Sequence, residues 1–227
     1  MIEAIVLILL ACSEPLPESA DGRMHAAWEA WQAEDWARAA DAVLLLSEAD
    51  GEGELTALTE TPGVMVVNPL PGCTVEQVED IVIALNQDEL FDIFDHYDRS
   101  YTSPLSDWEE QREQLDWQSD YGFTIPLAGP ADATLMATMR EQDGVLFAVN
   151  TLAGPAVWEE EGSTFDEDFR LEAWTHRDGA VVHVEGLWRH MIAGAYNTEN
   201  EAIRDIVLNG LVDWDEQMVE LCEQGLP

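Results

Sequence analysis

Hydrophobic and polar positions alternate with two different periods along this chain, and the first stretch of its body has the helical period. Residues 23–48 are rich in alanine, which favours helix, and they place Trp28, Trp31 and Trp36 at spacings that build one apolar stripe. The polar residues 33–35 interrupt the stripe. We therefore expect a small helical extension near the N-terminus, divided into a hairpin of two helices.

A main domain is expected over residues 62–227, after an acidic, glycine-bearing linker at 49–61. The domain begins with a short apolar run at 64–67, which predicts a strand. Thr74 and Gln77 have the spacing of a capping box, so a helix should begin directly after Thr74.

The middle of the main domain changes from a helical pattern to the period of a strand. Apolar residues within 90–97 predict a second short helix. In 115–127 the apolar side chains occupy odd positions with mostly polar residues between them, which is typical of a half-buried strand.

Aspartate-glycine pairs at 143–144 and 178–179 lie between apolar runs and predict two β-hairpins. The hairpins should extend over about 134–152 and 169–190. A further short strand is expected around 157–158. The sequence thus predicts about six antiparallel strands in succession.

The last element is a helix from about residue 199 to residue 223, with a broad apolar face. Thr198 and Glu201 have the spacing of a capping box at its start. Gly210 is unfavourable in a helix interior by about 1 kcal/mol. It therefore indicates either a kink or a close approach to a sheet or ligand.

This order of elements resembles that of START-like, or helix-grip, domains across residues 62–225. The resemblance depends on the opening VMVVNPLPGCTVEQVEDI, where a strand leads through a proline-bearing turn into a capped helix, and on the wide apolar face of the last helix. In that family a curved antiparallel sheet wraps the final helix, and a hydrophobic ligand occupies the space between them. The resemblance implies an α+β fold of this kind. A cystatin-like sheet or another α+β arrangement is the alternative.

The same resemblance implies a cavity lined by inward-facing residues of the strands and the last helix. The residues that we expect to line it are Trp117, Tyr121, Phe123, Phe147, Trp174, Trp188, Leu211 and Trp214. Each of them also fits an ordinary core position. Nine tryptophans in 227 residues agree with a large apolar pocket or with an aromatic core.

The charge of the chain excludes one class of partner. There are 47 acidic residues against nine arginines and no lysine, and the net charge is −38. Nucleic acids and anionic lipid head groups are bound through cationic side chains, so this surface repels them. Because the acids are spread along the whole chain, they indicate solubility in a salty environment rather than capture of divalent cations.

The first thirteen residues, MIEAIVLILLACS, resemble the signal peptide and lipobox of bacterial lipoproteins. The resemblance implies a signal peptide at 1–11, lipidation of Cys12, and a tether at 12–22. The apolar run of residues 4–11 is much shorter than the roughly twenty residues that span a bilayer. Glu3, without any Lys or Arg, departs from the usual signal pattern. A buried N-terminal strand or helix with an incidental cysteine is the alternative.

The residue after the cysteine bears on localisation. In Gram-negative lipoproteins an aspartate at this position tends to retain the protein at the inner membrane, whereas this chain has Ser13. We therefore expect a cell-envelope protein at the outer membrane, attached only through its lipid anchor.

With Cys12 lipidated, Cys73 and Cys222 are left as one pair in an oxidising compartment. A bridge between them would join the beginning of the main domain to its end. Closing so long a loop could stabilise the fold by roughly 4–5 kcal/mol in the chain-entropy model. Two unrelated buried thiols are the alternative.

Metal-binding patterns are weak in this sequence. One acidic cluster consists of Asp92, Asp95, His96 and Asp98. It lacks the central glycine of an EF-hand, and such clusters arise by chance in so acidic a chain. His183 and His190 are seven residues apart on one expected strand, so they should point to opposite faces and lie at the surface or rim. We expect no metal site and no cofactor.

Catalytic motifs are also missing from the sequence. There is no G-x-S-x-G elbow, and the lack of lysine excludes P-loop and Schiff-base chemistry. No catalytic residue is assigned, and the sequence favours a protein that is not an enzyme. The leading hypothesis is a lipid-anchored binder of a hydrophobic small molecule or lipid. The second is an envelope lipoprotein with a filled core, whose 23–48 helices bind a protein partner.

Overall fold

The computed structural model describes residues 15–49, 51–125, 128–158 and 162–226. The expected signal peptide and Cys12 lie outside these ranges. Within them, the helices are all too short or too polar to cross a membrane.

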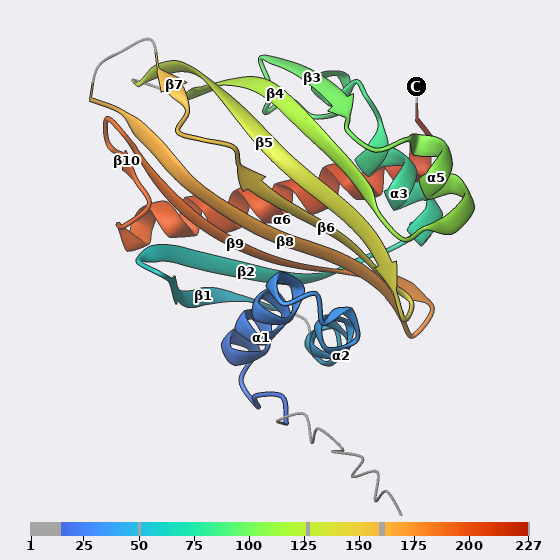
Figure 1. The fold of residues 1–227 in the computed structure, drawn as a ribbon. Coiled ribbons are helices and arrows are strands. Elements are labelled where there is room, and N and C mark those ends of the chain that lie inside the picture. The colour runs from blue at the N-terminus through green and yellow to red at the C-terminus, as the bar shows by residue number, and fades with distance from the viewer. Residues whose placement is uncertain (1–14, 50, 126–127, 159–161, 227) are drawn as a thin grey trace, which may run out of the picture.

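The centre of the molecule is an antiparallel sheet of ten strands (Figure 1). The strands are β1 (Gly51–Leu58), β2 (Thr61–Leu70), β3 (His96–Tyr101), β4 (Leu115–Ile125), β5 (Gly129–Gln142), β6 (Val145–Leu152), β7 (Val157–Trp158), β8 (Thr164–Arg177), β9 (Ala180–Ala193) and β10 (Tyr196–Asn197). Their order is β1-β2-β9-β8-β6-β5-β4-β3, with β10 paired to β9 and β7 to β5.

Six helices accompany the sheet within the described residues. They are α1 (Ala20–Gln32), α2 (Trp36–Leu46), α3 (Val75–Ile83), α4 (Gln87–Leu90), α5 (Leu105–Gln111) and α6 (Glu201–Gln224). Figure 1 shows α6 crossing one face of the sheet, with α1 and α2 on the other side. The expected fold class, a sheet wrapped around a long C-terminal helix with N-terminal helices attached, is confirmed.

Both faces of the central strands are covered, as β9 illustrates. Val184 and Trp188 belong to the core cluster beneath α1 and α2. Leu187, which points the other way, packs with Leu208 and Leu211 of α6. Because both faces are covered, β9 is buried at successive positions rather than at alternate ones.

The N-terminal helices form a layer on the sheet. Trp28 and Trp31 are buried, and the ring of Trp28 lies 5.7 Å from that of Trp188. Gly186 permits the close approach of Met24 on α1 to β9, because a Cβ at that position would lie only 2.6 Å from Met24 Sδ. Trp28 and Trp31 therefore pack within the molecule, and little of their surface is exposed to a protein partner.

Helix α1 begins earlier than the sequence predicts. The Ser19 hydroxyl accepts a hydrogen bond from the backbone N–H of Gly22 at 3.1 Å and caps the helix. The last residues of the expected tether at 12–22 therefore belong to α1, which begins at Ala20.

Two element assignments were wrong. The expected linker at 49–61 contains β1, which pairs with β2 from Gly51 opposite Val67 to Leu55 opposite Gly63. β1 is a mostly exposed edge strand, so its order comes from backbone pairing and leaves no alternation in the sequence. The expected helix at 90–97 is replaced by a turn and β3, which pairs with β4.

The two predicted capping boxes had different outcomes. The box formed by Thr74 and Gln77 is present at the start of α3. The one at α6 is absent, because Asn200 caps that helix and accepts from the N–H of Ala202. Thr198 is buried instead, and its hydroxyl accepts from Met191 N at 3.0 Å.

A disulfide joins Cys73 to Cys222 and closes a loop of 149 residues. Gln77 Nε2 adds a hydrogen bond to the carbonyl oxygen of Cys222 at 3.0 Å. The C-terminal end of α6 is thus attached to the start of α3, as the cysteine pairing predicts.

Candidate functional site

A cavity of about 500 Å³ lies between α6 and the concave face of the sheet. Its wall is aromatic and aliphatic: Tyr121, Phe123, Phe165, Leu187, Met191, Leu211 and Trp214. Ile93 and Ile206 also line the cavity, and each of these side chains is 55% exposed. The cavity is therefore open between the turn before β3 and the N-terminal half of α6.

Four of the eight residues expected from the sequence line this cavity. They are Tyr121, Phe123, Leu211 and Trp214. Trp214 is fixed by Phe91, whose ring is stacked on it at 3.6 Å. The other four expected residues are placed elsewhere, for two different reasons.

Phe147 and Trp188 lie on the opposite face of the sheet, under α1 and α2. In β6 and β9 the inward-facing positions are the neighbours of these residues, such as Leu146 and Leu187. Because both faces are buried, the residue type alone does not show on which face an apolar side chain of these strands lies.

Trp117 and Trp174 lie on the cavity side but outside the cavity. The guanidinium carbon of Arg99 is 4.7 Å from the ring centre of Trp117 and covers it. Trp174 is stacked on the imidazole of His183 at 5.0 Å and an interplanar angle of 7°. Both indoles are therefore occupied by contacts within the protein.

Charged side chains form part of the cavity lining. Asp168, Arg170 and Arg189 line it, which means that two of the nine arginines of this acidic chain are in the cavity. Arg189 Nη2 donates to Asp168 Oδ2 at 2.8 Å. Burial disfavours the charged guanidinium, but Asp168, with smaller contributions from Tyr196 and Tyr121, acts in the opposite direction, and the pKa of Arg189 is raised.

These charged residues were absent from the sequence prediction, although a signal for them exists. The aspartate-glycine turn at 178–179 sets the register of β8 and β9. That register places Asp168 opposite Arg189 and Glu172 opposite Glu185. Charged residues facing each other across these two paired strands would have indicated a polar site.

The charged residues of the cavity continue into the core as one row. This row consists of Asp168, Arg170, Arg189, Glu172, Glu185, His183 and Asp215. Arg170 Nε lies 3.2 Å from Glu185 Oε1, and Glu172 is close to both. His183 Nδ1 is 2.6 Å from Asp215 Oδ1 on α6. The prediction that His183 lies at the surface or rim was wrong, since it is fully buried between the sheet and α6.

Two groups of this row have strongly shifted pKa values. Burial disfavours the charged imidazole, but the charge and hydrogen bond of Asp215, together with the charges of Glu185 and Glu172, act in the opposite direction and raise the pKa of His183 to about 9. Burial also raises the pKa of Glu185 to about 7, with Arg170 acting in the opposite direction. Glu172, His183 and Glu185 are the side chains that could hold a metal ion within the described ranges.

Among the described residues, the acidic cluster considered from the sequence does not bring three ligand atoms together as Glu172, His183 and Glu185 do. Asp92 and Asp95 lie at the cavity, where Asp95 accepts a hydrogen bond from Thr124 at 2.7 Å. His96 is on β3, with its Nε2 3.5 Å from Asp132 Oδ1.

Comparisons with known proteins bear on the fold. No family model matches the chain, and no curated protein matches it in sequence. Human STARD10 is similar in structure, with a TM-score of 0.55 and 8% identity over 85% of this chain and 80% of that chain. The lipid transfer and protein localization domain of human StarD13 (DLC2) matches with a TM-score of 0.44 and 10% identity, over 88% and 97% of the two chains. Protein Ms6760 from Mycobacterium smegmatis matches with a TM-score of 0.39 and 11% identity, over 78% and 98%. The likeness to STARD10 shows that the chain has a START-like fold.

Proposed function

We propose that this protein is an exported, lipid-anchored protein whose START-like domain binds a hydrophobic small molecule or lipid between the sheet and α6, without catalysing a reaction. The observation that carries the proposal is the open cavity of about 500 Å³ with its aromatic wall. Ligand pockets in proteins commonly measure roughly 300–1,000 Å³. The alternative, an envelope protein with a filled core, does not account for this space.

The charged part of the lining supports an amphiphilic ligand. Arg189 Nε and Asp168 Oδ1 are buried and have no hydrogen-bond partner within the described residues. Buried polar atoms without partners are unfavourable by about 1–3 kcal/mol each. A ligand with an apolar body and one polar group would fill the aromatic wall and supply the missing hydrogen bonds.

Blocking the cavity should abolish binding, and Gly210 on α6 offers the position for it. Gly210 lines the cavity, and a Cβ added to it would meet no heavy atom within 4 Å among the described residues, apart from its chain neighbours and the nearby backbone of its own helix. In Gly210→Trp the indole would take up space that a ligand needs. We expect at least a tenfold loss of affinity for cis-parinaric acid, measured by the rise of its fluorescence on titration with the protein.

The matched control is Asn209→Trp, one position earlier on the same helix, which is exposed and does not line the cavity. It should bind the probe as the unmodified chain does. Gly210→Ala should also bind, and should stabilise the helix by about 1 kcal/mol. Equal affinity of Gly210→Trp and the unmodified chain would refute binding in this cavity.

A natural ligand can be sought directly. The protein is purified from its native host without detergent, and native mass spectrometry is followed by organic extraction and analysis of the extract. The proposal expects a small apolar or amphiphilic compound in near-stoichiometric amount. An empty protein from several growth conditions would count heavily against a carrier function.

The lipid anchor rests on the sequence around Cys12 and is tested separately. Expressed in a Gram-negative bacterium, the full-length chain should incorporate an alkyne-labelled fatty acid and fractionate with the outer membrane. Cys12→Ala should lose the label completely. Ser13→Asp should keep it but move the protein to the inner membrane, and labelling of the Cys12→Ala variant would contradict the anchor.

A further inference from the structure

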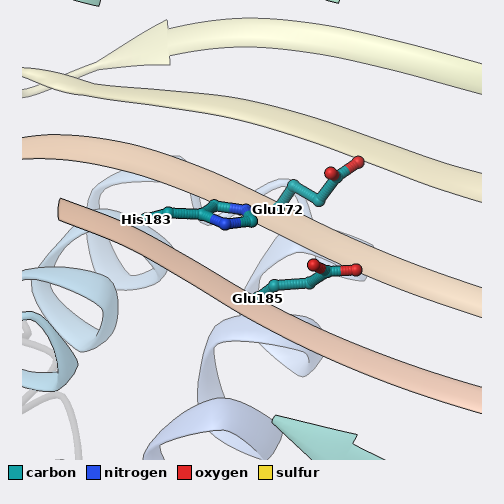
Figure 2. A group of neighbouring side chains, drawn as sticks. All are labelled: Glu172, His183 and Glu185. Carbon is teal, nitrogen blue, oxygen red and sulfur yellow. The ribbon is translucent and has the colours of Figure 1, made fainter. Parts of the chain in front are cut away.

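Three buried side chains with metal-binding atoms converge next to the cavity, on the hairpin of β8 and β9 (Figure 2). They are Glu172, His183 and Glu185. One ligand atom from each lies within 4.8 Å of the other two. The exposed fractions of these residues are 6%, 0% and 0%, so solvent does not hydrate the group.

Several buried atoms of this group lack hydrogen-bond partners. His183 Nε2 and both carboxylate oxygens of Glu185 have no hydrogen-bond partner among the described residues. Arg170 Nε forms an ion pair with Glu185 Oε1 at 3.2 Å, but without hydrogen-bond geometry. Buried polar atoms are nearly always satisfied in native proteins. Several unsatisfied atoms side by side therefore indicate that a bound species completes the site.

The surroundings orient these side chains as the second shell of a metal site would. His183 Nδ1 is 2.6 Å from Asp215 Oδ1, and Asn68 Nδ2 donates to the other oxygen of Asp215 at 2.7 Å. A metal-bound histidine commonly donates its remaining N–H to a carboxylate in this way. Asn150 Nδ2 likewise donates to Glu172 Oε2 at 3.0 Å. Both second-shell contacts leave His183 Nε2 and the other oxygen of Glu172 available.

The charges of the buried row favour a divalent cation. Its acidic members are Asp168, Glu172, Glu185 and Asp215, and its arginines are Arg170 and Arg189. A metal ion binds to a deprotonated imidazole nitrogen, so in the metal-bound state His183 is neutral and the other groups sum to −4 + 2 = −2. Uncompensated charge in a protein interior is strongly unfavourable, and one doubly charged ion balances this row.

We propose that Glu172, His183 and Glu185 bind one divalent transition-metal ion, with Zn²⁺ as the first candidate. One imidazole nitrogen and two carboxylates suit Zn²⁺, Mn²⁺ or Fe²⁺, whereas Ca²⁺ and Mg²⁺ take oxygen ligands. Three protein ligands leave a coordination position for water or for a polar group of a cavity ligand. The site does not depend on the proposed lipid binding.

This site escaped the sequence analysis because its ligands do not share a local motif. Glu172 comes from β8, and His183 and Glu185 come from β9, across the turn at 178–179. Their spacing is that of paired strands, so a search for helical or loop metal motifs passes over it.

Metal titration of the full-length chain tests the proposal. The protein is stripped with a chelator and titrated with Zn²⁺ by calorimetry, in high salt and excess Mg²⁺ so that exposed acidic groups do not contribute. We expect one equivalent to bind tightly. Glu185→Gln should remove this binding, and Asp215→Asn should weaken it by roughly 10–100-fold, as second-shell changes do.

The matched control is His190→Gln. His190 is also on β9 and pairs with an aspartate, Asp166, at 2.6 Å, but it is partly exposed and outside the cluster. This variant should bind Zn²⁺ with unchanged affinity. Circular dichroism of every variant shows whether it folds, so that a loss of binding is assigned to the site.

A measurement on the unmodified protein does not depend on any variant. The chain has five histidines, so ¹⁵N-histidine spectra resolve each imidazole. One equivalent of Zn²⁺ should shift the Nε2 resonance of His183 alone. Weak binding of several equivalents that is unchanged in Glu185→Gln would overturn the proposal. So would an unshifted His183 resonance, and the cluster would then be a buried hydrogen-bond and ion-pair network without a metal.

Discussion

Removing the disulfide between Cys73 and Cys222 should lower the melting temperature of the protein by about 10 °C. The bridge closes a loop of 149 residues, and loss of a native disulfide typically destabilises by about 2–5 kcal/mol. For a chain of this size each kcal/mol corresponds to roughly 2–4 °C. The effect should be large because the bridge holds the C-terminal end of α6, which covers one face of the sheet.

The experiment compares thermal unfolding of the full-length chain with that of the double variant Cys73→Ser/Cys222→Ser, followed by circular dichroism. Cys12→Ala is the matched control, since it removes a cysteine outside the bridge and should leave the melting temperature unchanged. Reducing agent should lower the melting temperature of the unmodified chain but not that of the double variant. If reductant and the double variant both have no effect, the bridge does not stabilise the fold.

Trp188→Ala should destabilise the protein by about 3–5 kcal/mol, the usual effect of removing a large aromatic side chain from a core. Trp188 is fully buried, and its ring is 5.7 Å from that of Trp28 on α1. Its Nε1 donates to the carbonyl oxygen of Thr56 on β1 at 3.0 Å. The substitution would thus leave a cavity and an acceptor without its donor where α1, β1 and β9 meet.

Chemical denaturation measures this loss in the free energy of unfolding, and two other variants serve for comparison. Trp36→Ala removes a tryptophan that is only partly buried and is covered by Arg140, so about 1 kcal/mol should be lost. Trp188→Phe should retain much of the packing. Because Trp188 lies on the face of the sheet opposite the cavity, the folded Trp188→Ala variant should bind cis-parinaric acid with unchanged affinity. A reduced affinity would indicate that Trp188 lines the cavity.

Local patterns were sufficient for the hairpins and for the long helices. The aspartate-glycine pairs at 143–144 and 178–179 predicted the turns of the β5–β6 and β8–β9 hairpins, and in both pairs the aspartate and glycine have positive φ. The apolar period over 199–223 predicted α6, with bounds within two residues. These signals are local because a two-residue turn and a helix face depend on residues close in the chain.

Elements that depend on a partner strand were missed. β1 has glycine and glutamate at most of its first positions, and β3 is polar at nearly every position. Each is a terminal strand of the sheet order, and each is held by backbone hydrogen bonds to one neighbour. Side-chain patterns report burial rather than backbone pairing, so such edge strands leave little trace in a sequence.

The candidate site was predicted in part, and the reason lies in the two covered faces of the sheet. In β4 only one face is buried, and its alternation led to Tyr121 and Phe123. In β6 and β9 both faces are buried, so Phe147 and Trp188 were assigned to the cavity by residue type alone and lie behind the sheet. The buried His183 was misplaced because its partner Asp215, on α6, lies 32 residues away in the chain.

The sequence by itself determined the order of most elements and the turns of the two hairpins, and it favoured the pairing of Cys73 with Cys222 and the START-like architecture over their alternatives. Only the tertiary structure decided which face each strand residue occupies, because that depends on where α1, α2 and α6 pack. It also decided that Glu172, His183 and Glu185 meet as a buried cluster. Periodicity reports how much of a side chain is buried, but the partner that buries it is chosen by contacts between segments far apart in the chain.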